Sequence, residues 1–301
     1  MKGWHIGAFK NGFDTDITMI GVLLLIAALG VAMQGFFQKI YNNSTAAKVS
    51  VYSFNLLVVA TALVVFLPQV RDLNCLKTDM VFYSAGFSVT YFCSLWFILK
   101  AIEIGSLSLS SLINSYALII PTIFGVIFLD EPVGILTVIG FVLTMVSLYF
   151  VGDTKKSEHI SKKWILYISL SFLGNGLCST IQKFYQIKSG GLYKAEFMSF
   201  ALILAVVAMS VFIFAREKSL PIPKIKNGGL FAVCCGLFNG LVNLLTMYLA
   251  KFPAPVVYPT ISGGSIIIAF IFSKYIFKEK LSTKQTIGFL IGIVAVVVLN
   301  L

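Results

Sequence analysis

The chain has 301 residues, of which 58% are hydrophobic and 12% charged, and its mean hydropathy is +0.94. Ordinary soluble chains carry about 25% charged residues, so this composition excludes a soluble globule with a fully polar surface. The formal net charge of +11 comes from basic residues in short patches between long apolar runs. That placement is typical of loops beside anionic lipid headgroups and not of a nucleic-acid-binding surface. We therefore expect a multi-pass protein of the cell membrane, with membrane lipid and no nucleic acid as its partner.

Ten apolar segments follow one another along the chain. A hydrocarbon core about 30 Å thick needs roughly 20 helical residues to cross it, and each segment is close to that length. The predicted spans are 17–40, 47–69, 79–99, 106–128, 133–152, 163–187, 196–215, 228–250, 255–277 and 284–301.

A phrase on the first predicted span is repeated on the sixth. "GVAMQGFFQKIY" begins at Gly30, and "GNGLCSTIQKFY" begins 144 residues later at Gly174. Two further matches follow in the same order. The pair Ser53-Phe54 returns at residues 199–200, and the stretch from Glu131 to Gly140 returns at residues 279–288. The chain therefore reads as two five-span copies, at residues 17–152 and 163–301.

The odd number of spans in each copy predicts their relative orientation. After five crossings the second copy enters from the opposite face of the membrane, so the copies are related by a pseudo-two-fold axis in the membrane plane. The predicted fold class is an all-α polytopic membrane protein, with ten transmembrane helices as two inverted five-helix repeats. Such an arrangement suits a path that opens to either side of a central site.

Two long stretches resemble a known family. "ALIIPTIFGVIFLDEPVGILTVIGFVLTMVSLYFV" and "SGGSIIIAFIFSKYIFKEKLSTKQTIGFLIGIVAVVVLNL" are similar to the two copies of the EamA-type repeat of the drug/metabolite transporter superfamily. The resemblance spans nearly the whole chain. It implies a ten-helix bundle that exports or exchanges small metabolites, and it leaves the substrate open.

Charged groups are absent from the middle of the predicted spans. All twelve acidic residues fall at or beyond span ends, and both histidines lie outside the spans. This pattern argues against a metal site, an exchanger of cationic drugs with a buried carboxylate, and an intramembrane hydrolase, which needs an activated nucleophile with a base in reach. We expect no enzyme activity and no cofactor.

Neutral polar residues instead recur at helical spacing on six spans. Because an intramembrane polar side chain is costly, it is a candidate for function, and residues spaced i, i+4 lie on one helix face. The predicted substrate-binding residues are Gln34, Gln38, Ser88, Tyr91, Asn114, Asn175, Gln182, Asn239, Asn243, Tyr258 and Ser262.

A structural role is the alternative for each of these residues. Polar side chains also join helices by hydrogen bonds worth about 0.6 kcal/mol on average. For the serines packing is the favoured interpretation, and for the mid-span amides the two interpretations are balanced. Lys39 and Lys183, near span ends, are expected to extend to the interface. Glu131 and Glu279 each precede a span and are expected to cap the helix that follows.

The orientation in the membrane has two conflicting indications. The family arrangement places both termini inside. The distribution of basic residues places most of them in loops that would then lie outside, so the positive-inside rule favours termini outside.

The function that these features favour is transport of a small neutral or zwitterionic organic metabolite, such as an amino acid, by alternating access around a central cavity. The protein would act as a monomer or a homodimer. The alternatives are a flippase for a lipid or lipid-linked substrate, which needs a lateral opening, and a non-transporting subunit of a membrane assembly, in which the polar stripes would pack against one another.

Overall fold

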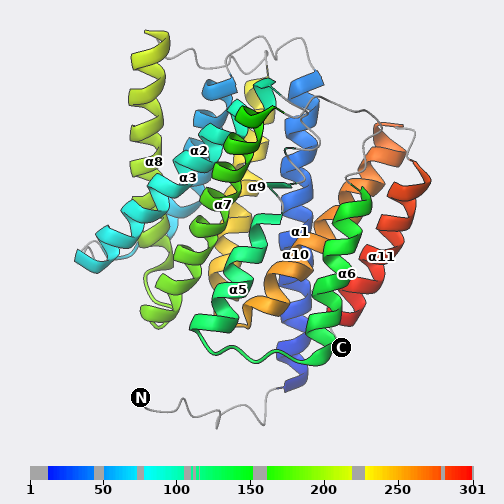
Figure 1. Cartoon of the computed structure of the whole chain (residues 1–301). Coiled ribbons are helices and arrows are strands. Elements are labelled where there is room, and N and C mark those ends of the chain that lie inside the picture. The colour runs from blue at the N-terminus through cyan, green and yellow to red at the C-terminus, as the bar shows by residue number, and fades with distance from the viewer. Residues whose placement is uncertain are drawn as a thin grey trace.

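The computed structural model describes residues 13–43, 51–72, 78–104, 110, 113–114, 116–151, 161–218, 228–278 and 282–299. In these ranges the chain forms α-helices joined by turns and short 3₁₀ or π segments, with no strand. The helices lie side by side as a bundle (Figure 1). The prediction of an all-α protein is confirmed for the described residues.

The helices follow the predicted spans closely. The first half contains α1 (Phe13–Asn43), α2 (Val51–Phe66), α3 (Thr78–Ile104), α5 (Ile119–Phe128) and α6 (Ile135–Val151). The second half contains α7 (Lys162–Lys188), α8 (Lys194–Glu217), α9 (Gly229–Leu249), α10 (Ala254–Ile271) and α11 (Thr283–Leu299). Seven of them, all except α5, α6 and α11, include segments long and apolar enough to cross a membrane, while these three are shorter apolar helices. The protein is a multi-pass membrane protein.

The structure describes only part of the predicted span 106–128, and residues 110 and 113–114 in it are helical. A 3₁₀ turn at Tyr116–Leu118 precedes α5, which begins only at Ile119. Pro121 is the third residue of α5. The first four N–H groups of a helix have no intrahelical acceptor, so a proline there removes no helical hydrogen bond. Residues 105–109, 111–112 and 115 lie outside the described part of the chain.

The repeated phrase lies where helices pack closely. A methyl group added at Gly30 on α1 would come within 2.6 Å of the Val242 side chain on α9, and one at Gly174 on α7 would come within 2.9 Å of the Thr90 carbonyl oxygen on α3. The two tyrosines that end the phrase are buried and stack on phenylalanines of the next helix. The ring centroids are 4.1 Å apart for Tyr41 and Phe54, and 4.3 Å apart for Tyr185 and Phe197. Both copies of the phrase thus serve helix packing at these positions.

The direction of each helix can be followed from its contacts. Helices α1 and α9 are antiparallel, because Gly30 faces Val242 while Phe37, further along α1, stacks on Phe238. The chain therefore ends α9 and begins α10 at the end of the bundle where α1 begins. We call this end the terminal end, and it is the lower end in Figure 1.

Helices α6 and α11 form the pair at the right of Figure 1. Gly140, early in α6, lies against Leu299 at the end of α11. Ser147, late in α6, donates a hydrogen bond of 2.6 Å to the carbonyl oxygen of Gly288, early in α11. The two helices therefore run antiparallel.

We expect Gly236 to be essential for the packing of α9 on α2. A methyl group there would lie 2.5 Å from the carbonyl oxygen of Val58 and 2.6 Å from Cβ of Thr61. Gly236→Ala should lower the free energy of unfolding by about 1–3 kcal/mol, the usual cost of overpacking, as measured by unfolding of the purified protein in mixed micelles. Gly35→Ala is the control, because nothing lies within 4 Å of its added methyl group. Equal stabilities of the two variants would contradict this packing.

Candidate functional site

Five polar side chains from four helices form a hydrogen-bonded cluster, which we call the central network. Asn239 on α9 donates to Oε1 of Gln34 on α1 at 3.0 Å and accepts from the Tyr91 hydroxyl on α3 at 3.2 Å. Asn243 donates to Oδ1 of Asn239 at 3.1 Å. Gln182 on α7 donates to the backbone carbonyl of Asn243 at 3.0 Å. All five were predicted as binding residues from their spacing, and the fold brings them together.

The central network lies where the two halves of the chain meet. Tyr91 and Asn239 are 148 residues apart, which is the offset that relates Glu131 to Glu279 in the sequence repeat. A side chain that bonds to its own repeat equivalent lies close to the axis that relates the copies. Around this contact the side chains are amides, a phenol and the Cys235 thiol, which donates to the Gln34 carbonyl at 3.8 Å.

A second cluster, the Asn114 network, joins three more of the predicted residues. Ser171 on α7 donates to Oδ1 of Asn114, just before the 3₁₀ turn, at 3.0 Å. Asn175 donates to the backbone carbonyl of Asn114 at 3.2 Å. Tyr258 on α10 donates to the carbonyl of Ser179, one turn further along α7, at 3.4 Å. Ser171 and Ser179 were not predicted as site residues, although they share a face of α7 with Asn175.

Three of the predicted residues lie outside both networks. Gln38 is half-buried on α1, and Ser88 and Ser262 are buried on α3 and α10. Ser262 contributes its backbone carbonyl, which accepts from Ser265 at 2.8 Å. For the two serines this position agrees with the packing alternative.

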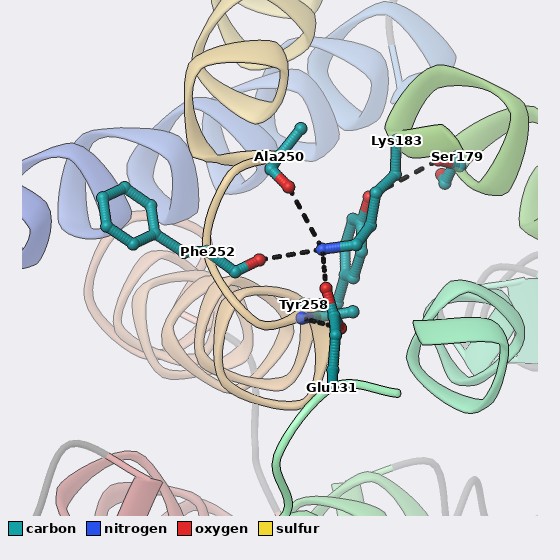
Figure 2. A network of polar contacts seen from close by, with 7 residues as sticks. Glu131, Ser179, Lys183, Ala250, Phe252 and Tyr258 are labelled. Atoms are coloured by element: carbon teal, nitrogen blue, oxygen red, sulfur yellow. Dashed lines mark hydrogen bonds and ion pairs between the residues drawn. The ribbon is translucent and has the colours of Figure 1, made fainter. Parts of the chain in front are cut away.

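A buried ion pair lies at the terminal end of the bundle (Figure 2). Nζ of Lys183 on α7 lies 2.6 Å from Oε1 of Glu131, and the two side chains are 1% and 13% exposed. Lys183 also donates to the carbonyl oxygens of Ala250 at 3.2 Å and Phe252 at 2.8 Å, which lie in the turn between α9 and α10. The second carboxylate oxygen of Glu131 accepts from the backbone N–H of Ala254 at 2.7 Å.

The prediction that Lys183 extends to the membrane interface was wrong. Glu131 caps a helix, as predicted, but a different helix from the one expected. Lys183 does not extend to the interface, because its ammonium bonds inward to the α9–α10 turn and to Glu131. Glu131 caps the N-terminus of α10 and not that of α6, which follows it in the chain. The carboxylate meets the unpaired N–H and the positive dipole end of α10, where it is most favourable. Glu279 lies outside the described residues.

A signal in the sequence could have identified this pair. The repeat conserves both its members, since Lys39 matches Lys183 and Glu279 matches Glu131. A basic and an acidic residue that recur together at span ends are better explained by a mutual contact than by two separate surface roles. The contact itself required the fold, because 52 residues separate Glu131 from Lys183.

The arrangement is suited to binding and not to bond chemistry. The two networks offer neutral donors and acceptors, while the Glu131–Lys183 pair lies at one end, with its ammonium and both carboxylate oxygens engaged in contacts within the protein. Within the described ranges no three His, Cys, Asp or Glu residues are grouped so that they could hold a metal ion.

The sequence of the chain matches a known protein family. A model of the EamA-like transporter family matches residues 18–152 and 162–301, one copy in each half. The chain belongs to the EamA-like transporter family. The resemblance to the EamA-type repeat of the drug/metabolite transporter superfamily is thereby confirmed. An EamA-like family is one of transporters and not of enzymes.

A solved structure shares the fold of this chain, at a sequence identity too low to indicate a function. No curated protein matches the chain. One solved structure, titled "Crystal structure of protein", has a TM-score of 0.75 over 93% of this chain and 98% of its own, at 10% sequence identity. This EamA-like protein therefore shares the architecture of a solved chain of the same size.

We expect Gln34 and Asn239 to stabilise each other across α1 and α9. In a double-mutant cycle of Gln34→Leu and Asn239→Leu, the coupling free energy should be about 0.6 kcal/mol and no more than about 1.7 kcal/mol, the range for hydrogen bonds between membrane helices. The measurement is the free energy of unfolding in mixed micelles. The control cycle pairs Gln34→Leu with Gln69→Leu, whose side chain donates to the Val65 carbonyl four residues earlier and should show no coupling. Equal coupling in both cycles would contradict the contact.

Proposed function

We propose that the protein moves a small neutral or zwitterionic organic metabolite, such as an amino acid, across the cell membrane by alternating access. The two repeats, residues 17–152 and 163–301, would form ten transmembrane helices of inverted orientation. The single observation that carries the proposal is the central network, in which neutral polar side chains of α1, α3, α7 and α9 meet at the junction of the repeats.

The helix directions support inversion of the repeats. Helices α6 and α11 are repeat equivalents, and their contacts make them antiparallel. The packing partners also correspond between the repeats. Helices α1 and α2 of the first repeat pack on α9 of the second, and their equivalents α7 and α8 pack on α3, which is the equivalent of α9. Two copies related by an in-plane two-fold axis have this pattern, and such copies can rock about a site at their junction.

The chemistry of the central network supports an uncharged or charge-balanced ligand. An ionic substrate would need a compensating charge at this depth, and the network supplies amide and hydroxyl groups. These groups now bond to one another, so a substrate would replace bonds that already exist. The exchange leaves few buried polar groups unsatisfied in either state, which keeps the difference in free energy between the states small.

A second candidate function is favoured by the same bonds. A subunit that only assembles with a partner would also have its polar stripes packed against one another, as Gln34 and Asn239 are. Cysteines placed at positions 34, 114 and 239 separate the two candidates. A transporter exposes them to a small water-soluble thiol reagent in at least one of its states, whereas a packed assembly subunit does not.

We expect the Tyr91 hydroxyl to contribute directly to transport. Proteoliposomes preloaded with a pool of the common amino acids would take up the same pool in radiolabelled form by counterflow. Tyr91→Phe removes one hydrogen-bonding group, worth about 0.5–1.5 kcal/mol, so the initial rate should fall about two- to twelvefold.

The matched control is Tyr149→Phe, the same chemical change at a side chain that is 74% exposed. Its rate should equal that of the unaltered protein. Absence of counterflow in the unaltered protein with amino acids, nucleosides and sugars alike would contradict the proposed transport. An equal loss of rate in both variants would contradict the role of the central network.

A further inference from the structure

The ion pair of Lys183 and Glu131 joins the two repeats. Lys183 and its backbone partners at Ala250 and Phe252 belong to the second repeat, while Glu131 belongs to the first. Glu131 also accepts from Ala254 of the second repeat. Both carboxylate oxygens of Glu131 therefore contact the second repeat, at the terminal end of the bundle.

All three donors of the Lys183 ammonium are engaged, so it offers none to a substrate. A lysine ammonium has three donors, and those of Lys183 are taken by Glu131 and two carbonyl oxygens, as Figure 2 shows. Both oxygens of Glu131 are also engaged. The cluster is therefore suited to holding segments of the chain together and not to binding a substrate.

The local backbone is built to present Glu131 to the second repeat. Asp130 has a positive φ of 49°, a left-handed conformation that few residues other than glycine, asparagine and aspartate adopt readily. This turn leads the chain out of α5, so that the N–H of Glu131 bonds back to the Gly125 carbonyl at 3.2 Å. A methyl group at Gly125 would overlap the carboxylate of Glu131 and come within 2.8 Å of Cβ of Ala254.

We propose that the ion pair of Glu131 and Lys183 is a latch that closes the transport path at the terminal end. The inference rests on the proposed function, because only a path opened by relative motion of the repeats needs such a latch. Separating the two ions inside the protein would leave each one buried and unpaired, which is strongly unfavourable. Opening this end to water hydrates both ions at once, so the latch is stable when fully closed or fully open and unstable in between.

The other end of the bundle has a related feature. Lys39, the repeat equivalent of Lys183, lies at the end of α1 away from the terminal end. Its Nζ is 4.4 Å from the centre of the Phe277 ring, in the segment that leads from α10 toward α11. Lys183 likewise lies against the segment that leads from α5 to α6. The repeat therefore places a lysine against the same connection at both ends.

The native Cys178 can report on the path. It lies on α7 four residues before Gln182, on the same helix face, and is 5% exposed. With Cys75, Cys93, Cys234 and Cys235 replaced by serine, its labelling rate by a membrane-impermeant maleimide is measured in oriented proteoliposomes, with the reagent added to one side at a time. The test variant is Glu131→Gln with Lys183→Met, because removing both charges together avoids an unpaired buried ion.

The control variant breaks an exposed ion pair between the same repeats. Lys188 on α7 lies 2.7 Å from Asp79 on α3, and the two side chains are 45% and 68% exposed. Asp79→Asn with Lys188→Met therefore removes two charges near the same helix end without touching the latch. Exposed pairs contribute little to stability, so this variant should label within twofold of the unaltered protein from both sides.

The latch predicts at least a tenfold faster labelling of Cys178 from the terminal side in the test variant, with no increase from the opposite side. An unchanged labelling rate would overturn the latch. An equal increase from both sides together with a lower melting temperature would also overturn it, because a pair that only stabilises the fold gives that result. If the unaltered protein labels from one side and the test variant does not differ, the latch fails and the proposed function stands. If neither protein labels from either side, both fail.

Discussion

Polar groups on these helices must find their partners inside the protein, and this constraint organises the bundle. Lipid offers neither donors nor acceptors, so a buried amide or ammonium remains in the membrane only where another part of the chain completes its hydrogen bonds. The central network meets this condition with neutral groups from both repeats. The Lys183 cluster meets it with a charged pair, whose contacts hold four segments of the chain together. The same constraint that stabilises one conformation therefore also determines which contacts must change when the conformation changes.

The two clusters differ in how firmly they hold the structure. In the central network each bond joins neutral groups, so a competing ligand or water can replace it at small cost. Lys183 and Glu131 form a buried charge pair, in which the loss of either partner costs about 3–5 kcal/mol. The proposed transport by alternating access needs both properties, because a ligand site must exchange partners while a closed end must resist partial opening. Gln182 of the central network and Lys183 of the ion pair are consecutive residues of α7, so this helix contributes to both clusters.

Much of this architecture could be predicted from the repeated phrase and the odd span number. The lengths of the apolar segments predicted the positions of the helices. The spacing of polar residues predicted that Gln34, Tyr91, Asn239 and Asn243 lie on interior faces. The 3₁₀ turn before α5 was missed, because apolar length alone does not distinguish one continuous helix from two helical pieces. The burial of Lys183 was missed for another reason. Its position near a span end indicates the interface only when no other segment covers that end, and the α9–α10 turn and Glu131 come from distant parts of the chain.

The central claim is that the two copies cross the membrane in opposite directions around a shared polar interior. Asp72 and Lys218 follow α2 and α8 at repeat-equivalent positions, 146 residues apart. Single cysteines at these two positions, labelled with a membrane-impermeant maleimide in intact cells and again after permeabilisation, test the claim most directly. The account predicts that one of the two cysteines is labelled in intact cells and the other only after permeabilisation. Labelling of both from the same side would contradict it.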